Sequence, residues 1–127
     1  MKKSFEELMN VVKTLRAENG CAWDRQQTFE TIKKWLLDEA NEVAEAIDNK
    51  DYDNLKEELG DLMHIILFIS NIAEEKGLFT IKDSMQNAKE KLIRRHSHVF
   101  GENKTDDLDE IHRRWQEIKK QEKDGKN

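Results

Sequence analysis

Two short acidic repeats constrain the fold of this chain more than any other feature. They are Glu39-x-x-Glu42 and Glu58-x-x-Asp61. Residues three apart on an α-helix share one face, so each repeat directs two carboxylates the same way. Both repeats lie on helical stripes that are otherwise apolar, namely Ile32, Leu36, Glu39, Val43 and Ala46, then Glu58, Asp61, Ile65, Phe68 and Ile72. The stripes predict four carboxylates that converge between two packed helices.

Such a convergence of negative charge needs compensation. Four carboxylates in a low-dielectric environment repel one another by several kcal/mol unless protons or cations neutralise them. Hard divalent cations with oxygen ligands suit this arrangement, and Mg²⁺ is the first of them. The repeats therefore predict a magnesium site between the two helices, with Mn²⁺ as an alternative ion.

Composition favours a single helical domain. The chain has 127 residues, of which 36% are hydrophobic and 39% charged, and it has no proline. This balance is typical of long amphipathic helices rather than of sheet or disorder. The net charge of -5 and the interspersed basic residues argue against a nucleic-acid partner. We therefore expect an all-α protein that does not bind nucleic acid.

Cysteine content and hydropathy predict the compartment. The single cysteine, Cys21, excludes an internal disulfide and fits a reducing interior. The longest apolar run, at 65–69, is far too short to span a bilayer. We therefore expect a cytoplasmic protein with no membrane partner.

Capping residues and glycines predict where the helices begin and end. Segments 21–27 and 97–106 lack helical periodicity and are expected to be loops, and the polar tail 119–127 is expected to fray. The expected helices are one capped by Ser4 with Glu7 that ends before Asn19-Gly20, one from Thr28 to about Asn49, one from Asp51 to Gly77, one opened by Thr80 and Asp83, and a last one around Ile111, Trp115 and Ile118.

The third expected helix has apolar residues on more than one side. Positions 62–69 are apolar nearly all round, so a single core would leave part of this surface uncovered. The remaining apolar surface is expected to pack against another subunit. This predicts a homo-oligomer, either a dimer or a tetramer. Gly60 lies in the same helix at a cost of about 1 kcal/mol relative to alanine. Close approach of a neighbouring backbone or a ligand would explain that glycine.

Five sequence segments together resemble the MazG family of nucleotide pyrophosphohydrolases. They cover nearly the whole chain, in the family's order and near its spacing: Cys21-Ala22-Trp23-Asp24, Glu39-Ala40-Asn41-Glu42, Glu57-Glu58-Leu59-Gly60-Asp61-Leu62, Lys91-Leu92-Ile93-Arg94-Arg95-His96-Ser97-His98-Val99-Phe100-Gly101, and Trp115-Gln116-Glu117-Ile118-Lys119. The resemblance implies one MazG-like domain over residues 1–127. Its expected fold is a four-helix bundle with a C-terminal helix, assembled as a dimer or higher oligomer.

The resemblance also implies an activity and its catalytic residues. A protein similar to this family would hydrolyse a nucleoside triphosphate between the α- and β-phosphates, giving the monophosphate and pyrophosphate. It would require Mg²⁺ and a metal-activated water. By the family's motif, the metal-binding and catalytic residues would be Glu39, Glu42, Glu58 and Asp61. The physical interpretation agrees, because bound cations neutralise a triphosphate and activate water near neutral pH.

Substrate contacts are implied for five further residues. Lys91 and Arg95, four residues apart, match family positions that resemble phosphate contacts. Trp115 and Lys119 have the same spacing, which suits stacking on a base beside a phosphate charge. Trp23 is similar to the tryptophan that packs on the base in related enzymes.

Other aromatic side chains are expected to be structural. Trp35 lies on the apolar side of the 28–49 helix and is expected to pack there. His64 lies within the most apolar stretch and is expected to be a buried, hydrogen-bonded imidazole.

The family commonly has Glu where this chain has Asp38. If that family residue orients the attacking water, the shorter side chain of Asp38 would orient it less well.

Two alternative functions remain open at this point. A non-enzymatic helical module could bind a metal structurally or dock a protein partner, and it would show metal-dependent stability without pyrophosphate release. A phosphoribosyl-ATP pyrophosphatase would keep the helices and the carboxylates but act on a different substrate. Comparing that compound with ordinary triphosphates would separate the two pyrophosphatases.

Overall fold

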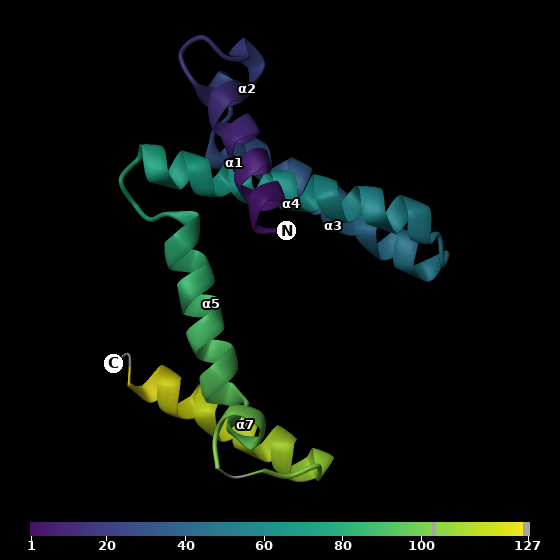
Figure 1. Cartoon of the computed structure of the whole chain (residues 1–127), viewed down its shortest axis with the longest axis vertical. Coiled ribbons are helices and arrows are strands. Elements are labelled where there is room, and N and C mark those ends of the chain that lie inside the picture. The colour runs from purple at the N-terminus through teal and green to yellow at the C-terminus, as the bar shows by residue number, and fades with distance from the viewer. Residues whose placement is uncertain (103, 126–127) are drawn as a thin grey trace. The chain divides into compact units, whose positions relative to one another are not determined.

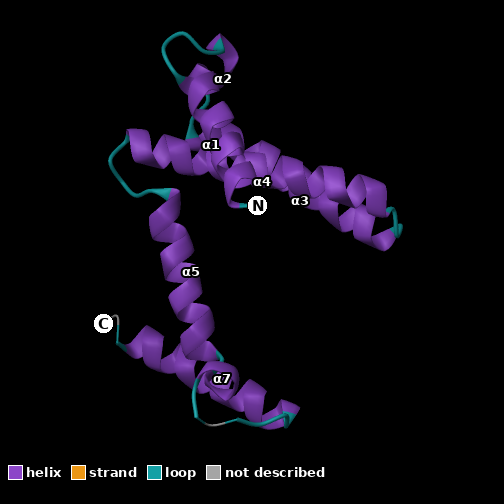
Figure 2. Ribbon diagram, in the orientation of Figure 1, coloured by secondary structure: helices purple, strands orange, loops and turns teal. Residues whose placement is uncertain are grey.

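The computed structural model describes residues 1–102 and 104–125, and within them every regular element is a helix (Figures 1 and 2). This confirms the all-α expectation. The chain divides into two compact units, Met1–Ile81 and Lys82–Asn127, and each is described by itself. The helices are α1 (Lys2–Arg16), α2 (Ala22–Gln26), α3 (Phe29–Asp48), α4 (Tyr52–Glu75), α5 (Ile81–Arg95), α6 (Ser97–Phe100) and α7 (Leu108–Asp124).

The start of the chain differs from the sequence expectation. The first helix begins at Lys2 and not after Ser4, and no side chain caps it, so the expected capping box is wrong. A short helix, α2, occupies the segment expected to be a loop. Five residues are too few to show a hydrophobic period, which is why the sequence pattern could not indicate this helix.

The two long helices begin and end where their caps predict. Thr28 and Thr31 form a reciprocal capping box, in which the Thr28 hydroxyl accepts from the Thr31 N–H at 3.3 Å and Thr31 Oγ1 accepts from the Thr28 N–H at 2.8 Å. The Asp51 carboxylate caps α4 by accepting from the Asn54 N–H at 3.2 Å. Gly77, with φ of 70°, follows the end of α4 in the left-handed conformation that glycine adopts readily.

The core of the first unit lies between α1, α3 and α4. Helices α3 and α4 run side by side, joined by a short turn, and α1 packs on α4 (Figure 1). The buried core residues are Val12, Ile32, Ile65, Leu67, Phe68 and Ile72. Because Ile32 and Ile65 belong to the stripes that carry the acidic repeats, this packing turns the four carboxylates toward the α3–α4 contact.

One stripe of α4 remains exposed. Leu59, Met63 and Ile66 are 50%, 42% and 38% exposed, and their spacing places them on one helical face. Gly60 lies beside this stripe, and a Cβ built there meets no atom within 4 Å. Close approach of a described part of this chain therefore does not explain the glycine.

The second unit contains α6, α7 and all of α5 after its first residue. Helix α6 lies within the segment 97–106 that was expected to be a loop. Helix α7 continues to Asp124, so the expectation of a frayed tail is wrong for residues 119–124. In the last turn of this helix, the Glu122 carboxylate accepts from Arg94 Nε at 2.6 Å and Arg95 Nη2 at 2.8 Å, and these contacts stabilise the helix end. The end of the expected tail, 126–127, lies outside the described residues.

Within the described part of the chain, no helix combines the length and the hydropathy needed to span a membrane.

Candidate functional site

The acidic repeats form one carboxylate cluster on facing turns of α3 and α4. Glu39, Glu58 and Asp61 each place an oxygen within 4.8 Å of the others. Glu39 and Glu58 are half-buried, whereas Asp61 is exposed. Glu42 is exposed and lies outside this group of three, but its carboxyl interacts with those of Glu58 and Glu39. The structure thus gathers three of the four predicted ligands and places the fourth beside them.

Two oxygens in this cluster lack partners. Glu39 Oε2 and Glu58 Oε2 are buried and accept no hydrogen bond from the described residues. A buried carboxylate oxygen without a donor is costly, and such atoms are rare in folded proteins. A hard divalent cation would supply the missing interaction, since carboxylate oxygens are its preferred ligands. The donor set therefore fits Mg²⁺ or Mn²⁺.

Electrostatics in the cluster favour neutralisation of its charge. The pKa of Glu39 is raised, first by burial and then by the negative charges of Glu42 and Asp61. The pKa of Glu58 is raised chiefly by its contact with the Glu39 carboxyl. The contact with Glu58 likewise raises the pKa of Glu42. All three shifts mean that this surface binds positive charge more readily than isolated glutamates do.

His64 differs from its expected role. It lies one turn beyond Asp61 on α4 and packs edge-on against Phe68, with ring centroids 6.1 Å apart. Its Nε2 atom is buried and has no hydrogen-bond partner among the described residues. The expectation of a hydrogen-bonded imidazole is therefore wrong for this nitrogen.

Trp23 and Trp35 form an aromatic pair on α2 and α3. Their ring centroids are 4.9 Å apart, and the rings are tilted by 51°. Trp35 is 48% exposed and Trp23 is 45% exposed, so the expected packing of Trp35 is against Trp23 at the surface and not within the buried core. The sequence held a signal for this, because Trp35 lies four residues before Glu39 and so shares its helical face.

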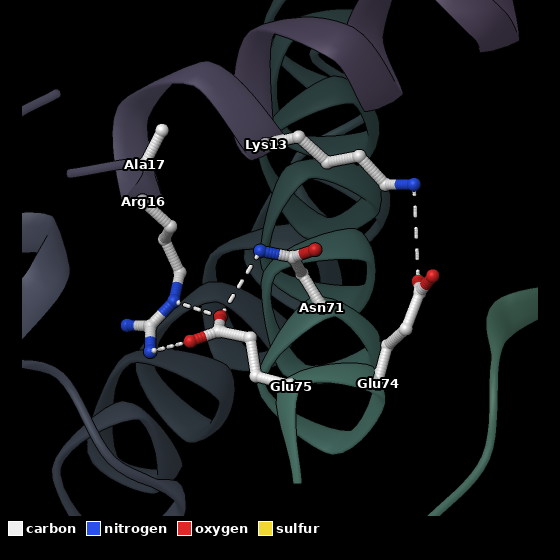
Figure 3. A pocket seen from close by; sticks show the side chains of 6 residues that line it. All are labelled: Lys13, Arg16, Ala17, Asn71, Glu74 and Glu75. Carbon is white, nitrogen blue, oxygen red and sulfur yellow. Dashed lines mark hydrogen bonds and ion pairs between the residues drawn. The ribbon is translucent and has the colours of Figure 1, made fainter. Parts of the chain in front are cut away.

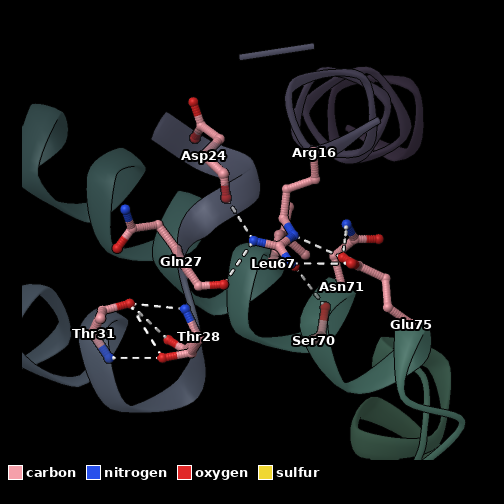
Figure 4. Close-up of polar contacts among 9 residues, drawn as sticks. All are labelled: Arg16, Asp24, Gln27, Thr28, Thr31, Leu67, Ser70, Asn71 and Glu75. Carbon is pink, nitrogen blue, oxygen red and sulfur yellow. Dashed lines mark hydrogen bonds and ion pairs between the residues drawn. The ribbon is translucent and has the colours of Figure 1, made fainter. Parts of the chain in front are cut away.

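Arg16 anchors the segment that carries Trp23 (Figure 4). Its guanidinium donates to the backbone carbonyls of Asp24 at 2.6 Å and Gln27 at 3.0 Å, on either side of the end of α2. The same group forms a forked ion pair with both carboxylate oxygens of Glu75, at 2.7 and 3.0 Å. The Arg16 side chain is 8% exposed and lies 5.2 Å from the centroid of the Phe68 ring. Sequence reasoning did not single out Arg16, and no local motif marks it.

A hollow of about 370 Å³ lies beside Arg16, lined by Lys13, Arg16, Ala17, Asn71, Glu74 and Glu75 (Figure 3). Arg16 pairs with Glu75, and Lys13 Nζ lies 3.8 Å from a Glu74 oxygen. Asn71 donates to Glu75 at 3.2 Å. Because the charges of this hollow already compensate one another, it has no net attraction for an ionic ligand.

The remaining predicted substrate residues belong to the second unit. Arg95 binds Glu122 and lies 5.6 Å from the centroid of the Trp115 ring. His96 meets the same ring edge-on, with centroids 4.8 Å apart. Trp115 also lines a hollow of about 210 Å³ on the surface of α7. The structure thus brings two of these predicted substrate residues, Arg95 and Trp115, into contact. Of the other two, the side chain of Lys91 is half-buried and that of Lys119 is exposed.

The fold and the cluster define an all-α protein with a group of carboxylates between two packed helices. The family described as the MazG nucleotide pyrophosphohydrolase domain matches residues 27–100, which include all four clustered carboxylates. The chain belongs to this family. The match spans parts of both units, and the expectation of one domain over residues 1–127 stays a prediction.

Similar proteins of known name support this assignment. The chain is 48% identical over 119 residues to the nucleoside triphosphate pyrophosphohydrolase/pyrophosphatase MazG of Thermotoga maritima, covering 94% of this chain and 45% of that protein. It is 40% identical over 120 residues to the nucleoside triphosphate pyrophosphohydrolase of Escherichia coli K12, covering 94% and 46%. The chain therefore spans less than half the length of these curated relatives.

A solved structure has the same fold. The crystal structure of a mazG-related protein from Thermotoga maritima superposes with a TM-score of 0.77 at 31% sequence identity. The superposition covers 91% of this chain and 98% of that one. Unlike the curated relatives, this protein is matched over nearly its whole length.

Proposed function

We propose that the protein is a Mg²⁺-dependent nucleoside triphosphate pyrophosphohydrolase that releases a nucleoside monophosphate and pyrophosphate. The carboxylate cluster carries this proposal, because two of its buried oxygens have no donor among the described residues and would suit a divalent cation. Family membership and the names of the relatives from Thermotoga maritima and Escherichia coli support the same activity.

In this proposal Glu39, Glu42, Glu58 and Asp61 hold the metal. Bound Mg²⁺ would offset the charge of a triphosphate and lower the pKa of a water that attacks it. The side chains of α3 and α4 orient this centre, and their helices supply a fixed frame, because Thr28 and Asp51 cap them. Positioning and charge stabilisation are the main requirements of phosphoryl transfer.

The basic side chains of the second unit would bind phosphate oxygens. Lys91, Arg95 and Lys119 supply the positive charge in this proposal. Arg95 already donates through Nε and Nη2 to one carboxylate oxygen of Glu122, and a phosphate would accept from the same two donors. A phosphate would then compete with Glu122 for Arg95.

Pyrophosphate release tests the activity directly. A panel of ribonucleoside and deoxyribonucleoside triphosphates with phosphoribosyl-ATP is incubated with Mg²⁺, with Mn²⁺ or with neither. Wild type is compared with Glu42→Gln and Asp61→Asn, and Glu45→Gln, an exposed position on α3, serves as the control. We expect metal-dependent release that both cluster variants reduce by orders of magnitude and the control retains.

The outcomes separate the alternatives. Full activity in both cluster variants would refute the assignment of these carboxylates. Selective hydrolysis of phosphoribosyl-ATP would identify the other pyrophosphatase. No release from any compound, with a metal-dependent rise in melting temperature, would favour the non-enzymatic metal-binding module.

We also propose that copies of this chain assemble through α4. Leu59, Met63 and Ile66 form an exposed apolar stripe on one face of this helix. Isolated exposed apolar residues are common, but a stripe at helical spacing has the form of a helix-packing surface. A second copy would cover it, giving a dimer or a larger homo-oligomer.

A further inference from the structure

Helix α2 contributes no apolar side chain to the buried core of the first unit. Its one buried residue, Asp24, is polar, and Trp23 is 45% exposed. A helix of five residues is also too short to be stable through its own hydrogen bonds, and no side chain caps its start. Contacts with other helices must therefore hold α2, although it adds nothing to the core.

Contacts with backbone carbonyls hold the start of α2 against the end of α1. The Cys21 N–H donates to the Leu15 carbonyl at 2.8 Å, and Arg25 Nη1 donates to the Glu18 carbonyl. Gly20 allows this close approach, because a Cβ at that position would clash with backbone carbonyls at the end of α1. The start of α2 is therefore fixed to a helix that packs on the core.

Arg16 holds the other end of α2. Its guanidinium donates to the carbonyls of Asp24 and Gln27, and it pairs with both carboxylate oxygens of Glu75 on α4 (Figure 4). Gln27 directly precedes Thr28, the N-cap of α3, so the same contact holds the link between α2 and α3. Because a guanidinium is planar and rigid, it sets the position of α2 relative to both helices that carry the carboxylate cluster.

The aromatic ring that α2 presents lies beside the proposed metal site. Trp23 packs against Trp35, which is four residues before Glu39 and so lies about 6 Å from it along the axis of α3. Nearly half of the Trp23 side chain remains exposed and accessible to a ligand. Any contact of Trp23 with a bound nucleotide thus depends on where Arg16 holds α2.

We propose that Arg16 is a positioning residue for nucleotide binding, which holds α2 and Trp23 in place beside the carboxylate cluster. This inference rests on the proposed function. The Arg16 side chain is 8% exposed and its nitrogens already donate to protein groups, so it acts through α2 and not by touching the substrate. Without Arg16, α2 occupies its binding-competent position for only part of the time, and the apparent affinity falls by that fraction.

Two neighbouring ion pairs offer a matched comparison (Figure 3). Arg16–Glu75 joins α1 and α4 and reaches α2, whereas Lys13–Glu74 joins the same two helices and has no hydrogen bond to α2 among the described residues. Arg16→Ala should raise KM about 5- to 50-fold for each nucleoside triphosphate hydrolysed, with little change in kcat, because two charge-assisted hydrogen bonds to the α2 segment are lost. Glu75→Gln should raise KM less, because Arg16 keeps its bonds to the carbonyls. Lys13→Ala and Glu74→Gln should leave both constants unchanged.

Leu8→Ala controls for a loss of stability alone. Leu8 packs against the core two turns before Arg16 on the same helix, so this substitution destabilises the first unit without removing a hydrogen bond to α2. All variants are assayed at a temperature at which circular dichroism shows them folded, and Leu8→Ala should keep the wild-type KM. In Arg16→Ala the Arg25 and Gln27 amides, which form the hydrogen bonds of α2, should exchange faster with solvent. Where Arg16→Ala does not fold, Glu75→Gln carries the same test.

Ligands that are not hydrolysed complete the test. Calorimetry with Mg²⁺ and α,β-methylene-ATP should show the same loss of affinity in Arg16→Ala, whereas inorganic tripolyphosphate, which has no base, should bind this variant as it binds wild type. An unchanged KM in every folded variant of Arg16 and Glu75, an equal rise in Leu8→Ala, or an equal loss for tripolyphosphate would refute the positioning role and leave the proposed function standing. If wild type neither hydrolyses nor binds any nucleotide in the presence of Mg²⁺, both proposals fail.

Discussion

At the level of single residues, the carboxylate cluster lowers the stability of the metal-free protein. Glu39 and Glu58 each bury an oxygen that has no donor among the described residues, and their pKa values are raised by burial and by neighbouring carboxyls. A protein under selection for stability alone would place apolar or paired groups there. This arrangement is common at functional sites, where ligand binding supplies the missing interaction.

Glu58→Gln should therefore stabilise the metal-free protein and abolish its response to metal. The substitution removes a negative charge from the cluster, so the melting temperature should rise by a few degrees without divalent ions. At a Mg²⁺ concentration 100 times the dissociation constant, wild type should gain about 2.7 kcal/mol, and the variant should gain much less. Thermal unfolding followed by circular dichroism, with and without Mg²⁺, measures both effects.

Glu57→Gln is the matched control, because Glu57 is the exposed neighbour on the same helix. It should leave the metal response as in wild type. An equal Mg²⁺ response in Glu58→Gln would contradict the assignment of Glu58 as a ligand.

At the scale of the element, a few charged side chains join segments that are distant in sequence. Arg16 of α1 binds the end of α2 and Glu75 of α4, which is 59 residues away. In the second unit, Glu122 of α7 forms ion pairs with both Arg94 and Arg95 of α5. These contacts hold α2, α5 and α7, in which no apolar side chain among the described residues is buried.

Arg16→Ala should destabilise the first unit by about 2–4 kcal/mol. The loss removes the Arg16 donor from the carbonyls of Asp24 and Gln27, of which Asp24 keeps only a 3.3 Å hydrogen bond from the Gln27 N–H. Glu75 is partly solvated and contributes less. Arg16→Lys should recover only part of this, because an ammonium cannot form the forked contact. Lys13→Ala, which removes the neighbouring exposed pair with Glu74, should cost less than about 1 kcal/mol. Urea unfolding of the four proteins tests the ranking, and equal losses at Arg16 and Lys13 would contradict it.

The Glu122 contact should depend on pH in a defined direction. Hydrogen bonds from Arg95 and then Arg94 lower the pKa of Glu122 from 4.5 to about 2. The folded state therefore binds this proton less readily than the unfolded state, so stability rises with pH across this interval. The advantage of wild type over Glu122→Gln should be complete above about pH 4.5 and should fade as the pH drops toward 2.

Melting temperatures of wild type and Glu122→Gln at pH 7, 4 and 3 measure this difference. Glu117→Gln is the control, because the Arg113–Glu117 pair lies within α7 and is largely exposed. A wild-type advantage that is constant from pH 7 to pH 3 would show that the Arg94 and Arg95 contacts are not formed in solution.

At the scale of the whole molecule, the exposed stripe of α4 bears on assembly. Analytical ultracentrifugation of wild type should show an oligomer whose population rises with concentration. Ile66→Glu should shift the protein toward the monomer, because burying a charge in an apolar helix contact is unfavourable. Leu78→Glu, at an exposed position beyond the end of α4, should not. A wild-type protein that stays monomeric at all concentrations would refute assembly through this helix.

Features that depend on neighbours within about one helical turn could be predicted from the sequence alone. The all-α class, the limits of α3 and α4 at Thr28, Asp51 and Gly77, and the shared face of each acidic repeat all follow from local hydrogen bonds and helical period. A local pattern can predict these features because the interacting groups are close together in the chain.

Which distant groups come into contact depends on how the helices pack. Arg16 binds Glu75, which is 59 residues away in the sequence. Glu122 binds Arg94, and α7 continues to Asp124 through a polar segment whose composition predicts a frayed tail. The pairing of Trp23 with Trp35 likewise depends on how α2 is anchored. No periodicity encodes these contacts, because each arises when separately formed helices pack and the packing selects one partner among many chemically equivalent side chains.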